Sequence, residues 1–283
     1  MGQLDPRAHA FRPDLADADL EGRVEATRFV AGEPAVVRRG LADLKRAPRD
    51  DAPLDSQLLF GERVRRFEET GGWAWVQAET DGYVGYVRAD ALREGPDAAP
   101  DHRVSVLVTH LYPEPDLKAP ALDIVTFGAR ARLQGQSGAF SEVDGGWLVT
   151  SHLTALDELE PDYVAIAFAF GGLPYLWGGR SALGLDCSAL IQLALDRAGI
   201  ACRRDSDQQA TNIGAEVSRD DLRRGDLVYM PGHVVIALDE ILVVNATAHH
   251  MMVSVEPLDD VLDRVAEESG RPFDQTIDVV RRP

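Results

Sequence analysis

A chain of 283 residues, of which 45% are hydrophobic, is long enough for two or three globular domains and too apolar for a disordered protein. Its formal net charge of −18 argues against nucleic acid or an anionic membrane as a partner, because such a surface repels phosphate groups. Two cysteines, Cys187 and Cys202, are too few for a disulfide framework. The N-terminal segment lacks a basic stretch followed by an apolar run, and no apolar stretch reaches membrane-spanning length, so we expect a cytoplasmic protein.

The first half of the chain is dominated by strand patterns. Residues 1–30 are mostly polar, which favours an extension lying over the body of the protein. In residues 31–95, apolar residues fall at every second position between turns. A linker follows, and the same pattern returns in residues 103–155. LLFGERVRRFEETGGWAWV and VTFGARARLQGQSGAFSEVDGGWLV share Phe-Gly, an alternating strand and Gly-Gly-Trp. This repetition predicts two small β-barrels that resemble bacterial SH3-like domains, which are spacers or binding modules in other settings.

The pattern changes in residues 156–283. Residues 161–172 (PDYVAIAFAFGG) indicate a helix that ends in glycines, and the apolar run after Cys187 indicates a second, buried helix. Three strand-like segments follow, RRGDLVYM (223–230), HVVIAL (233–238) and EILVVNAT (240–247). Helices followed by antiparallel strands predict an α+β domain, so the whole chain is expected to be two small barrels and one α+β domain.

The segment GLDCSAL (184–190) places a thiol at the start of the second helix. Asp186 can cap the free amides of the first turn. The positive end of the helix dipole favours a thiolate over a thiol, which would suit a nucleophile. The alternative interpretation of Cys187 is a small buried hydrophobic residue without chemistry.

A cysteine nucleophile needs a base, and the base needs an orienting partner. Of the seven histidines, His233, His249 and His250 lie on strand-like segments in the same domain as the thiol. His233 opens its strand directly after a Pro-Gly turn. It could equally be a hydrogen-bonded histidine at a strand end with no catalytic role.

A hairpin predicts the third residue. Asp-Glu suits a two-residue turn poorly, so we expect a loop over 238–240 or 237–241, which pairs residues whose numbers sum to 478. Asn245 then lies opposite His233, where its amide can accept a hydrogen bond from one ring nitrogen and fix the tautomer. If this register is wrong, His249 is the next candidate.

Four segments carry the chemistry of this domain: PYLWGGRSALGLDCSALIQLALDRAGI (174–200), RDSDQQ (204–209), RRGDLVYM (223–230) and GHVVIAL (232–238). They resemble the NlpC-type papain-like cysteine peptidases, which cut bacterial cell-wall peptides. Two SH3-like units ahead of such a domain resemble the subgroup of γ-D-glutamyl-L-diamino-acid endopeptidases. The resemblance implies that Cys187 is the nucleophile, His233 the base and Asn245 the polar third residue.

The resemblance also implies substrate-binding residues. Tyr175 corresponds to a tyrosine near the nucleophile. Asp186 and Ser188 correspond to residues that help bind the ammonium of a free N-terminal L-Ala, and Tyr83, in DGYVGYV, is the candidate for a tyrosine from the first barrel that closes the subsite. The structural alternatives are a helix cap for Asp186 and a barrel-core aromatic for Tyr83.

Two departures from the family pattern stand out. Asn245 occupies a position that often holds histidine, and Arg203 stands where a proline commonly precedes Arg204. We expect the two arginines to form a solvated pair near the cleft. No metal is expected at His249-His250, because adjacent strand residues point to opposite faces, and no cofactor is expected elsewhere.

These residues predict a hydrolase. The expected reaction is cleavage of the γ-D-glutamyl–L-diamino-acid bond in short murein peptides with a free N-terminal L-Ala, during turnover of imported wall fragments. The murein peptide is the expected partner, and neither nucleic acid nor a membrane is. Two alternatives stay open: a catalytically silent murein-binding protein, and an amidase or acyltransferase that uses the same Cys-His-Asn arrangement.

Overall fold

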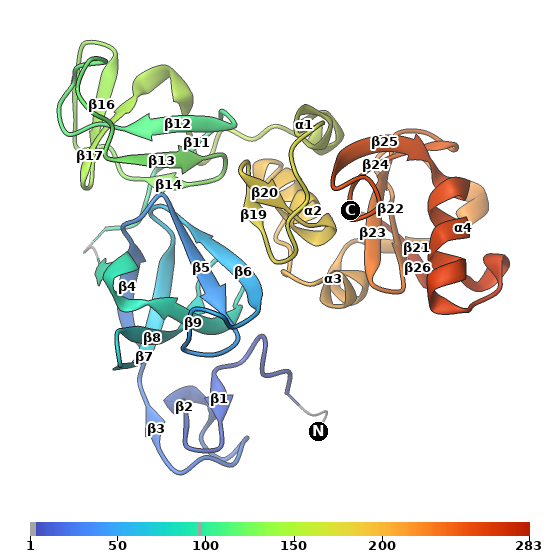
Figure 1. Ribbon diagram of the computed structural model, residues 1–283, viewed down its shortest axis with the longest axis horizontal. Helices are drawn as coiled ribbons and strands as arrows, with labels where there is room; N and C mark the ends of the chain where they lie inside the picture. Colours follow the sequence, from blue (N-terminus) through green and yellow to red (C-terminus); the bar gives the residue numbers. More distant parts are fainter. Residues whose placement is uncertain (1–3, 96–97) are drawn as a thin grey trace. The chain divides into compact units, whose positions relative to one another are not determined.

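A computed structural model describes residues 4–95 and 98–283 of the chain. The chain divides into two compact units, Met1–Glu158 and Leu159–Pro283 (Figure 1). In the described residues no helix is both long enough and apolar enough to cross a membrane.

The N-terminal extension lies on the first strand zone, as its polar composition suggests. It contains short strands β1 (Phe11–Arg12), β2 (Leu15–Asp17) and β3 (Phe29–Val30). Ala10 and Leu15 pack against Phe67 and Trp75 of the neighbouring sheet. The carboxylate of Asp17 accepts two hydrogen bonds from the Arg65 guanidinium, at 2.6 and 2.9 Å. An apolar contact and an ion pair therefore hold the extension in place.

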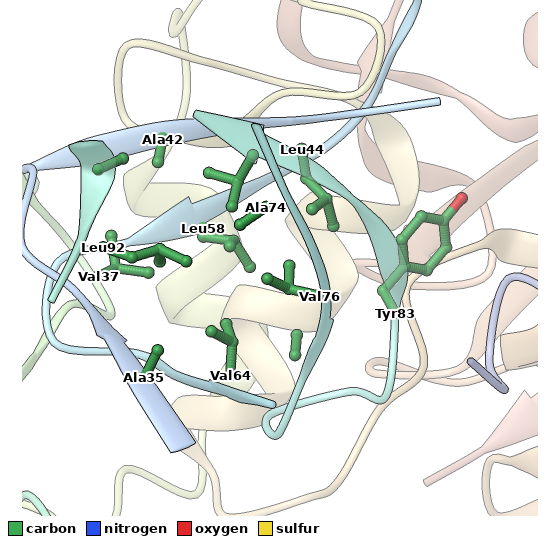
Figure 2. Packing of buried hydrophobic residues seen from close by; sticks show 13 residues of the cluster. Ala35, Val37, Ala42, Leu44, Leu58, Val64, Ala74, Val76, Tyr83 and Leu92 are labelled. Atoms are coloured by element: carbon green, nitrogen blue, oxygen red, sulfur yellow. The ribbon is translucent and has the colours of Figure 1, made fainter. Parts of the chain in front are cut away.

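The first strand zone forms one antiparallel sheet with strand order β10-β4-β7-β8-β9-β5-β6. Alternate side chains of these strands point inward, as the period of two in the sequence predicts, and they form an aliphatic cluster that includes Leu44, Val64 and Val76 (Figure 2). The strands are β4 (Glu33–Val37), β5 (Leu41–Lys45), β6 (Leu54–Leu59), β7 (Arg63–Thr70), β8 (Trp73–Ala78), β9 (Val84–Arg88) and β10 (Leu92–Glu94).

The second strand zone is more fragmented than its sequence repeat suggests. Its strands pair in separate small sheets with the orders β14-β11-β18, β12-β13 and β15-β16-β17. It is joined to the first zone by backbone contact, since the Arg130 amide donates to the Phe60 carbonyl at 2.8 Å. The strands are β11 (His102–Val104), β12 (Val108–Leu111), β13 (Asp123–Thr126), β14 (Arg130–Ala131), β15 (Gly135–Ser137), β16 (Phe140–Val143), β17 (Gly146–Val149) and β18 (Leu153–Ala155).

The second unit is built on an antiparallel sheet with strand order β21-β26-β22-β23-β24-β25. The predicted strands correspond to β22, β23 and β24, whereas β21, β25 and β26 have no counterpart in the sequence predictions. The strands are β21 (Ala215–Val217), β22 (Leu227–Met230), β23 (His233–Ala237), β24 (Leu242–Thr247), β25 (Met252–Pro257) and β26 (Val279–Arg282).

Helices cover both faces of this sheet (Figure 1). The helix α2 (Cys187–Arg197) packs against β23 and β24 and against α1 (Tyr163–Ala169), and both helices begin within a few residues of where the sequence predicts them. The helix α4 (Leu258–Ser269) packs on Val235, Ala237 and Val243 of the other face. A short helix, α3 (Ser206–Asn212), joins the two parts of the unit. The fold thereby places the start of α2 beside the start of β23.

Candidate active site

The thiol of Cys187 occupies the first position of α2, as the capping pattern predicts. Asp186 is the N-cap, and its Oδ1 accepts a hydrogen bond from the Ala189 amide at 2.9 Å. The thiol is buried, with 7% of Cys187 exposed. The backbone amides of Val234 and Ser188 hydrogen-bond its sulfur, so the thiol lies beside the first residues of β23.

The carboxylate of Asp186 is also the centre of a buried ion cluster. Its two oxygens accept from Arg204 Nη1 and Nη2 at 2.9 and 2.8 Å. They also accept from Ser188 Oγ and the Gly178 amide, each at 3.0 Å. With the Ala189 amide this makes five donors for a group that offers about four lone-pair sites. The hydrogen-bonding capacity of the Asp186 carboxylate is therefore filled from within the domain.

Arg204 corrects one sequence prediction. The guanidinium is not part of a solvated pair: Arg204 is 1% exposed and also donates to the Gly179 carbonyl at 3.2 Å and to Ser188 Oγ at 2.8 Å. A planar fork of donors fits a carboxylate bidentately, which explains why arginine can be buried here. The partner of Arg204, Asp186, is close in sequence. Nothing in the local sequence pattern, however, shows that the loop before α3 folds back onto Asp186 at the start of α2.

The electrostatics of the thiol differ from the dipole argument. Burial, followed by the neighbouring Asp186 charge, raises the pKa of Cys187 to about 12, although the Val234 amide and Arg204 act in the opposite direction. In the free protein, burial and the Asp186 charge therefore oppose the thiolate that the helix dipole favours. The desolvation arises because the residues of α2 from Cys187 to Leu195 are buried.

His233 and Asn245 are brought together by the sheet. The Nε2 atom of His233 lies 3.0 Å from Asn245 Oδ1, and Asn245 is fully buried. With Nε2 held in this way, Nδ1 is the nitrogen available to a thiol. Burial lowers the pKa of His233, while the hydrogen bond to Asn245 and the charge of Glu256 partly offset that effect.

The hairpin register differs from the prediction by two residues. Ile236 pairs with Val244 and Ala237 with Val243, so the paired numbers sum to 480 and not to 478. The cause lies in the turn, where Asp239 Oδ1 accepts from the Ile241 and Leu242 amides at 2.8 and 2.7 Å. A shift of two keeps every side chain on its predicted face. Asn245 is therefore a diagonal neighbour of His233, still within hydrogen-bond reach.

Glu256 extends the chain of polar groups and was missed in the sequence. Asn245 Nδ2 donates to Glu256 Oε1 at 2.9 Å, and Arg264 of α4 donates to Oε2 at 2.5 Å. Val243 pairs directly with Glu256, and Asn245 with Ser254, so Glu256 and Asn245 share one face of β24 and β25. The sequence signal for Glu256 was a charged residue in a segment with alternating polarity, and that signal does not identify Asn245 as its partner.

Tyr175 lies close to the thiol, as the family resemblance implies. Its amide donates to the Met251 carbonyl at 2.9 Å, and it forms a bridge with Leu185. Burial, followed by the charges of Cys187 and Asp186, raises the pKa of Tyr175, which places its hydroxyl in the electrostatic field of both groups. The phenol therefore stays protonated and can act as a hydrogen-bond donor.

Tyr83 belongs to the first unit. It is 6% exposed and joins the aliphatic cluster of that sheet, and its amide donates to Asp81 Oδ1 at 2.9 Å. Figure 2 shows its ring at the edge of the cluster, with the hydroxyl directed away from the aliphatic side chains. Its proposed role in binding substrate stays a prediction from the sequence.

His249 and His250 lie in a turn, which corrects the strand assignment behind the metal argument. Their rings are in edge contact, with centroids 4.6 Å apart, and His250 Nε2 lies 3.4 Å from Glu256 Oε2. The described parts of the chain hold no group of three or more His, Cys, Asp or Glu residues arranged to bind a metal ion. Asn245, rather than His249, contacts His233.

These groups can perform nucleophilic catalysis. At rest, burial favours the neutral thiol and the neutral imidazole. Attack on a carbonyl would transfer the thiol proton to His233, whose imidazolium can donate Nε2–H to Asn245. In the first turn of α2, the Ala189 amide already donates to Asp186 and the Ser188 amide to the Cys187 sulfur, so the amide of Cys187 itself is the group that can donate to the developing oxyanion. The arrangement fits acyl transfer from an amide to water.

Comparison with known proteins agrees with this geometry. Residues 172–263 match the NlpC/P60 family, and residues 44–92 match the bacterial dipeptidyl-peptidase Sh3 domain. The chain carries an NlpC/P60 cysteine peptidase domain behind a bacterial SH3 domain. It is therefore a peptidase.

The similarity extends over both units of this NlpC/P60 peptidase. It is 25% identical over 250 residues to "Dipeptidyl-peptidase 6" of Lysinibacillus sphaericus, an alignment that spans 80% of this chain and 92% of the relative. It is 27% identical over 199 residues to the "Gamma-D-glutamyl-L-lysine dipeptidyl-peptidase" of Bacillus cereus, covering 62% of this chain and 60% of that protein.

A solved structure shows the same fold. An NlpC/P60 family protein from Bacillus cereus aligns with a TM-score of 0.74 and 22% identity, over 88% of this chain and 99% of that one. The SH3 family match, residues 44–92, lies in the first strand zone. The fold is thus an SH3 domain with a papain-like NlpC/P60 domain, and the second barrel stays a prediction.

Proposed function

We propose that this NlpC/P60 peptidase hydrolyses the γ-D-glutamyl–L-diamino-acid bond of murein peptides that carry a free N-terminal L-Ala. The observation that carries the catalytic part is the His233–Asn245 hydrogen bond in the domain that buries the Cys187 thiol. The substrate class is supported by two relatives that are named as dipeptidyl-peptidases, one of which is aligned over 92% of its length.

The proposed reaction follows from the site. The Cys187 sulfur attacks the γ-carbonyl carbon while its proton passes to His233 Nδ1. The C–N bond then breaks, and the leaving amine takes the proton from His233, which leaves a thioester on Cys187. His233 then takes a proton from water as the water oxygen attacks the thioester carbon; the C–S bond breaks, the Cys187 sulfur recovers that proton, and L-Ala-γ-D-Glu is released. Atoms balance as one water consumed for one amide bond broken.

Recognition of the free amine is the finer part of the proposal. Ser188 and Asp186 stand beside the thiol, and Tyr83 is the residue that the sequence assigns from the SH3 domain. Because Arg204 already pairs with Asp186, we expect the ammonium to be bound mainly through shared hydrogen bonds and not through a full opposite charge. A requirement for a free L-Ala amine would exclude peptides still joined to muramic acid, so the proposed role is turnover of released wall fragments.

One substrate series tests the proposal. L-Ala-γ-D-Glu-diaminopimelate, its L-lysine analogue and the N-acetylated forms of both are incubated with the protein, and products are identified by mass spectrometry. We expect L-Ala-γ-D-Glu from the free-amine peptides and rates at least about tenfold lower after acetylation, the effect of losing one charge-assisted hydrogen bond. Tyr83→Ala should reduce that ratio. Equal cleavage of free and acetylated peptides would refute the amine requirement, and the absence of any cleavage would refute the substrate.

A further inference from the structure

The amide of Asn245 is held between two partners with opposite hydrogen-bonding character. Its Oδ1 lies 3.0 Å from His233 Nε2, and its Nδ2 donates to Glu256 Oε1 at 2.9 Å. Asn245 is fully buried and Glu256 is 7% exposed, so water has little access to either group. The orientation of the amide therefore depends on these two contacts.

Glu256 decides which way the amide points. An ionised carboxylate only accepts hydrogen bonds, so it must face the NH₂ group of Asn245 and not the oxygen. The oxygen then faces His233 and accepts from it, which requires the proton on Nε2 and leaves Nδ1 as the basic nitrogen. If the amide were reversed, its NH₂ group would face Nε2 and would favour the other tautomer, which cannot take a proton from the thiol at Nδ1.

We propose that Glu256 is a positioning residue, which fixes the orientation of the Asn245 amide and through it the catalytic tautomer of His233. The inference rests on the proposed role of His233 as the base. It adds a fourth member to the Cys-His-Asn arrangement, on the strand next to Asn245. Its acceptor-only character explains how an asparagine, which can point either way, can serve at the third position.

The surroundings of Glu256 keep it ionised. Arg264 donates to its Oε2 at 2.5 Å, and His250 Nε2 lies 3.4 Å from the same atom. Burial alone would raise the pKa of Glu256, but the hydrogen bonds from Asn245 and Arg264 hold it below the ordinary value. The carboxylate is therefore an acceptor over the whole range in which the thiol and histidine can react.

Glu256→Gln is the decisive variant, because glutamine has the same shape but can offer either an oxygen or an NH₂ group to Asn245. We expect kcat to fall about ten- to hundredfold, the cost of losing a hydrogen bond that involves a charged group. Glu268→Gln is the matched control. Glu268 is exposed, and like Glu256 its negative charge raises the pKa of His233, so this control removes a charge of the same sign from the surface. We expect it to change kcat less than about twofold.

A double-mutant cycle separates positioning from a general structural effect. If Glu256 acts through Asn245, then Glu256→Gln should have little further effect on kcat in the Asn245→Ala background. Equal reductions in both backgrounds would overturn the proposal. Thermal unfolding of each variant shows whether the fold is retained, and Glu256→Thr, which removes the carboxylate in a smaller side chain, replaces the glutamine variant if that one does not fold.

The tautomer can be read without any substrate. In ¹⁵N-histidine-labelled protein, NMR should show His233 protonated at Nε2 in the wild type and in Glu268→Gln, and a mixture of tautomers in Glu256→Gln. Unchanged Nε2 protonation in Glu256→Gln would overturn the proposal. Because this readout needs no turnover, a tautomer shift in a protein that cleaves none of the murein peptides would refute the proposed function and leave the positioning role standing.

Discussion

Two buried polar clusters lie in the NlpC/P60 domain, and they differ in how their hydrogen bonds are used. Around Asp186, five donors converge on one carboxylate, which leaves no acceptor site unused. Around Asn245, the contacts form a line from His233 through the amide to Glu256 and Arg264. The filled cluster around Asp186 holds its members in place. In the line from His233 to Arg264, each contact has one donor and one acceptor, so the line determines which nitrogen of His233 carries the proton. We therefore assign structure mainly to the first and proton handling to the second.

The largest expected effect is loss of the reacting groups themselves. Cys187→Ala and His233→Ala should each lower kcat by at least about a thousandfold, because nucleophile and base act as one unit. The release of L-Ala-γ-D-Glu measures this, and circular dichroism checks the fold. Residual activity of His233→Ala within tenfold of the wild type would contradict the role of His233.

Next in size is the loss of the buried cation from the filled cluster. Arg204→Met leaves the Asp186 charge buried without its partner, and we expect a loss of about 3–5 kcal/mol in the stability of the domain. Arg224→Met is the matched control, because Arg224 and Asp162 form an ion pair in which each side chain is 49% exposed, and it should cost less than about 1 kcal/mol. Hydrogen exchange of the α2 amides measures both. Equal effects would show that Arg204 is not structurally important.

A smaller effect is expected from the first link of the line. Asn245→Ala should lower kcat about ten- to hundredfold, well below the effect of His233→Ala, because the amide orients the base and takes no proton itself. Asn245→His should retain activity, since its second ring nitrogen can donate to Glu256. Steady-state kinetics on the free-amine peptide separate these outcomes. A loss for Asn245→Ala as large as that for His233→Ala would mean that the base is misplaced without its partner.

The two clusters also differ in how far the sequence predicts them. The thiol, its cap and the helix of Cys187 follow from a short stretch of residues, because capping and dipole effects are local. Asn245 was predicted on the correct face from strand alternation, even though the register is shifted by two. Arg204 and Glu256 could not be assigned their partners, because their contacts depend on how a loop and a neighbouring strand pack. The pKa of the thiol likewise depends on burial by the whole domain.

The same limit applies to the strand zones. Alternation predicted the strands of the first zone, and the local pattern of Phe-Gly and Gly-Gly-Trp recurs in the second. The pairing between strands, however, is set by contacts far apart in sequence, and the second zone divides into small separate sheets within the described residues. Sequence repetition therefore predicts that a region consists of strands and turns more securely than it predicts that these strands close into a barrel.

The smallest expected effect is a pH dependence of the stability of the domain. We expect it to arise from His233 and Glu256 in the line and not from the filled cluster around Asp186. His233 has a lowered pKa because burial disfavours its charged form, so the unfolded chain binds a proton before the folded one does. The stability of the domain should therefore fall as the pH drops below about 6.5, the ordinary histidine value, towards the folded pKa. Glu256, whose pKa is also lowered, adds a further loss of stability below about pH 4.3, the ordinary glutamate pKa.

Hydrogen exchange of the β23 and β24 amides at pH 7, 6 and 5 measures the loss of stability that we assign to His233. The variant His233→Gln should reduce the change in stability over this pH range. A slope that persists in His233→Gln would assign the effect to another histidine.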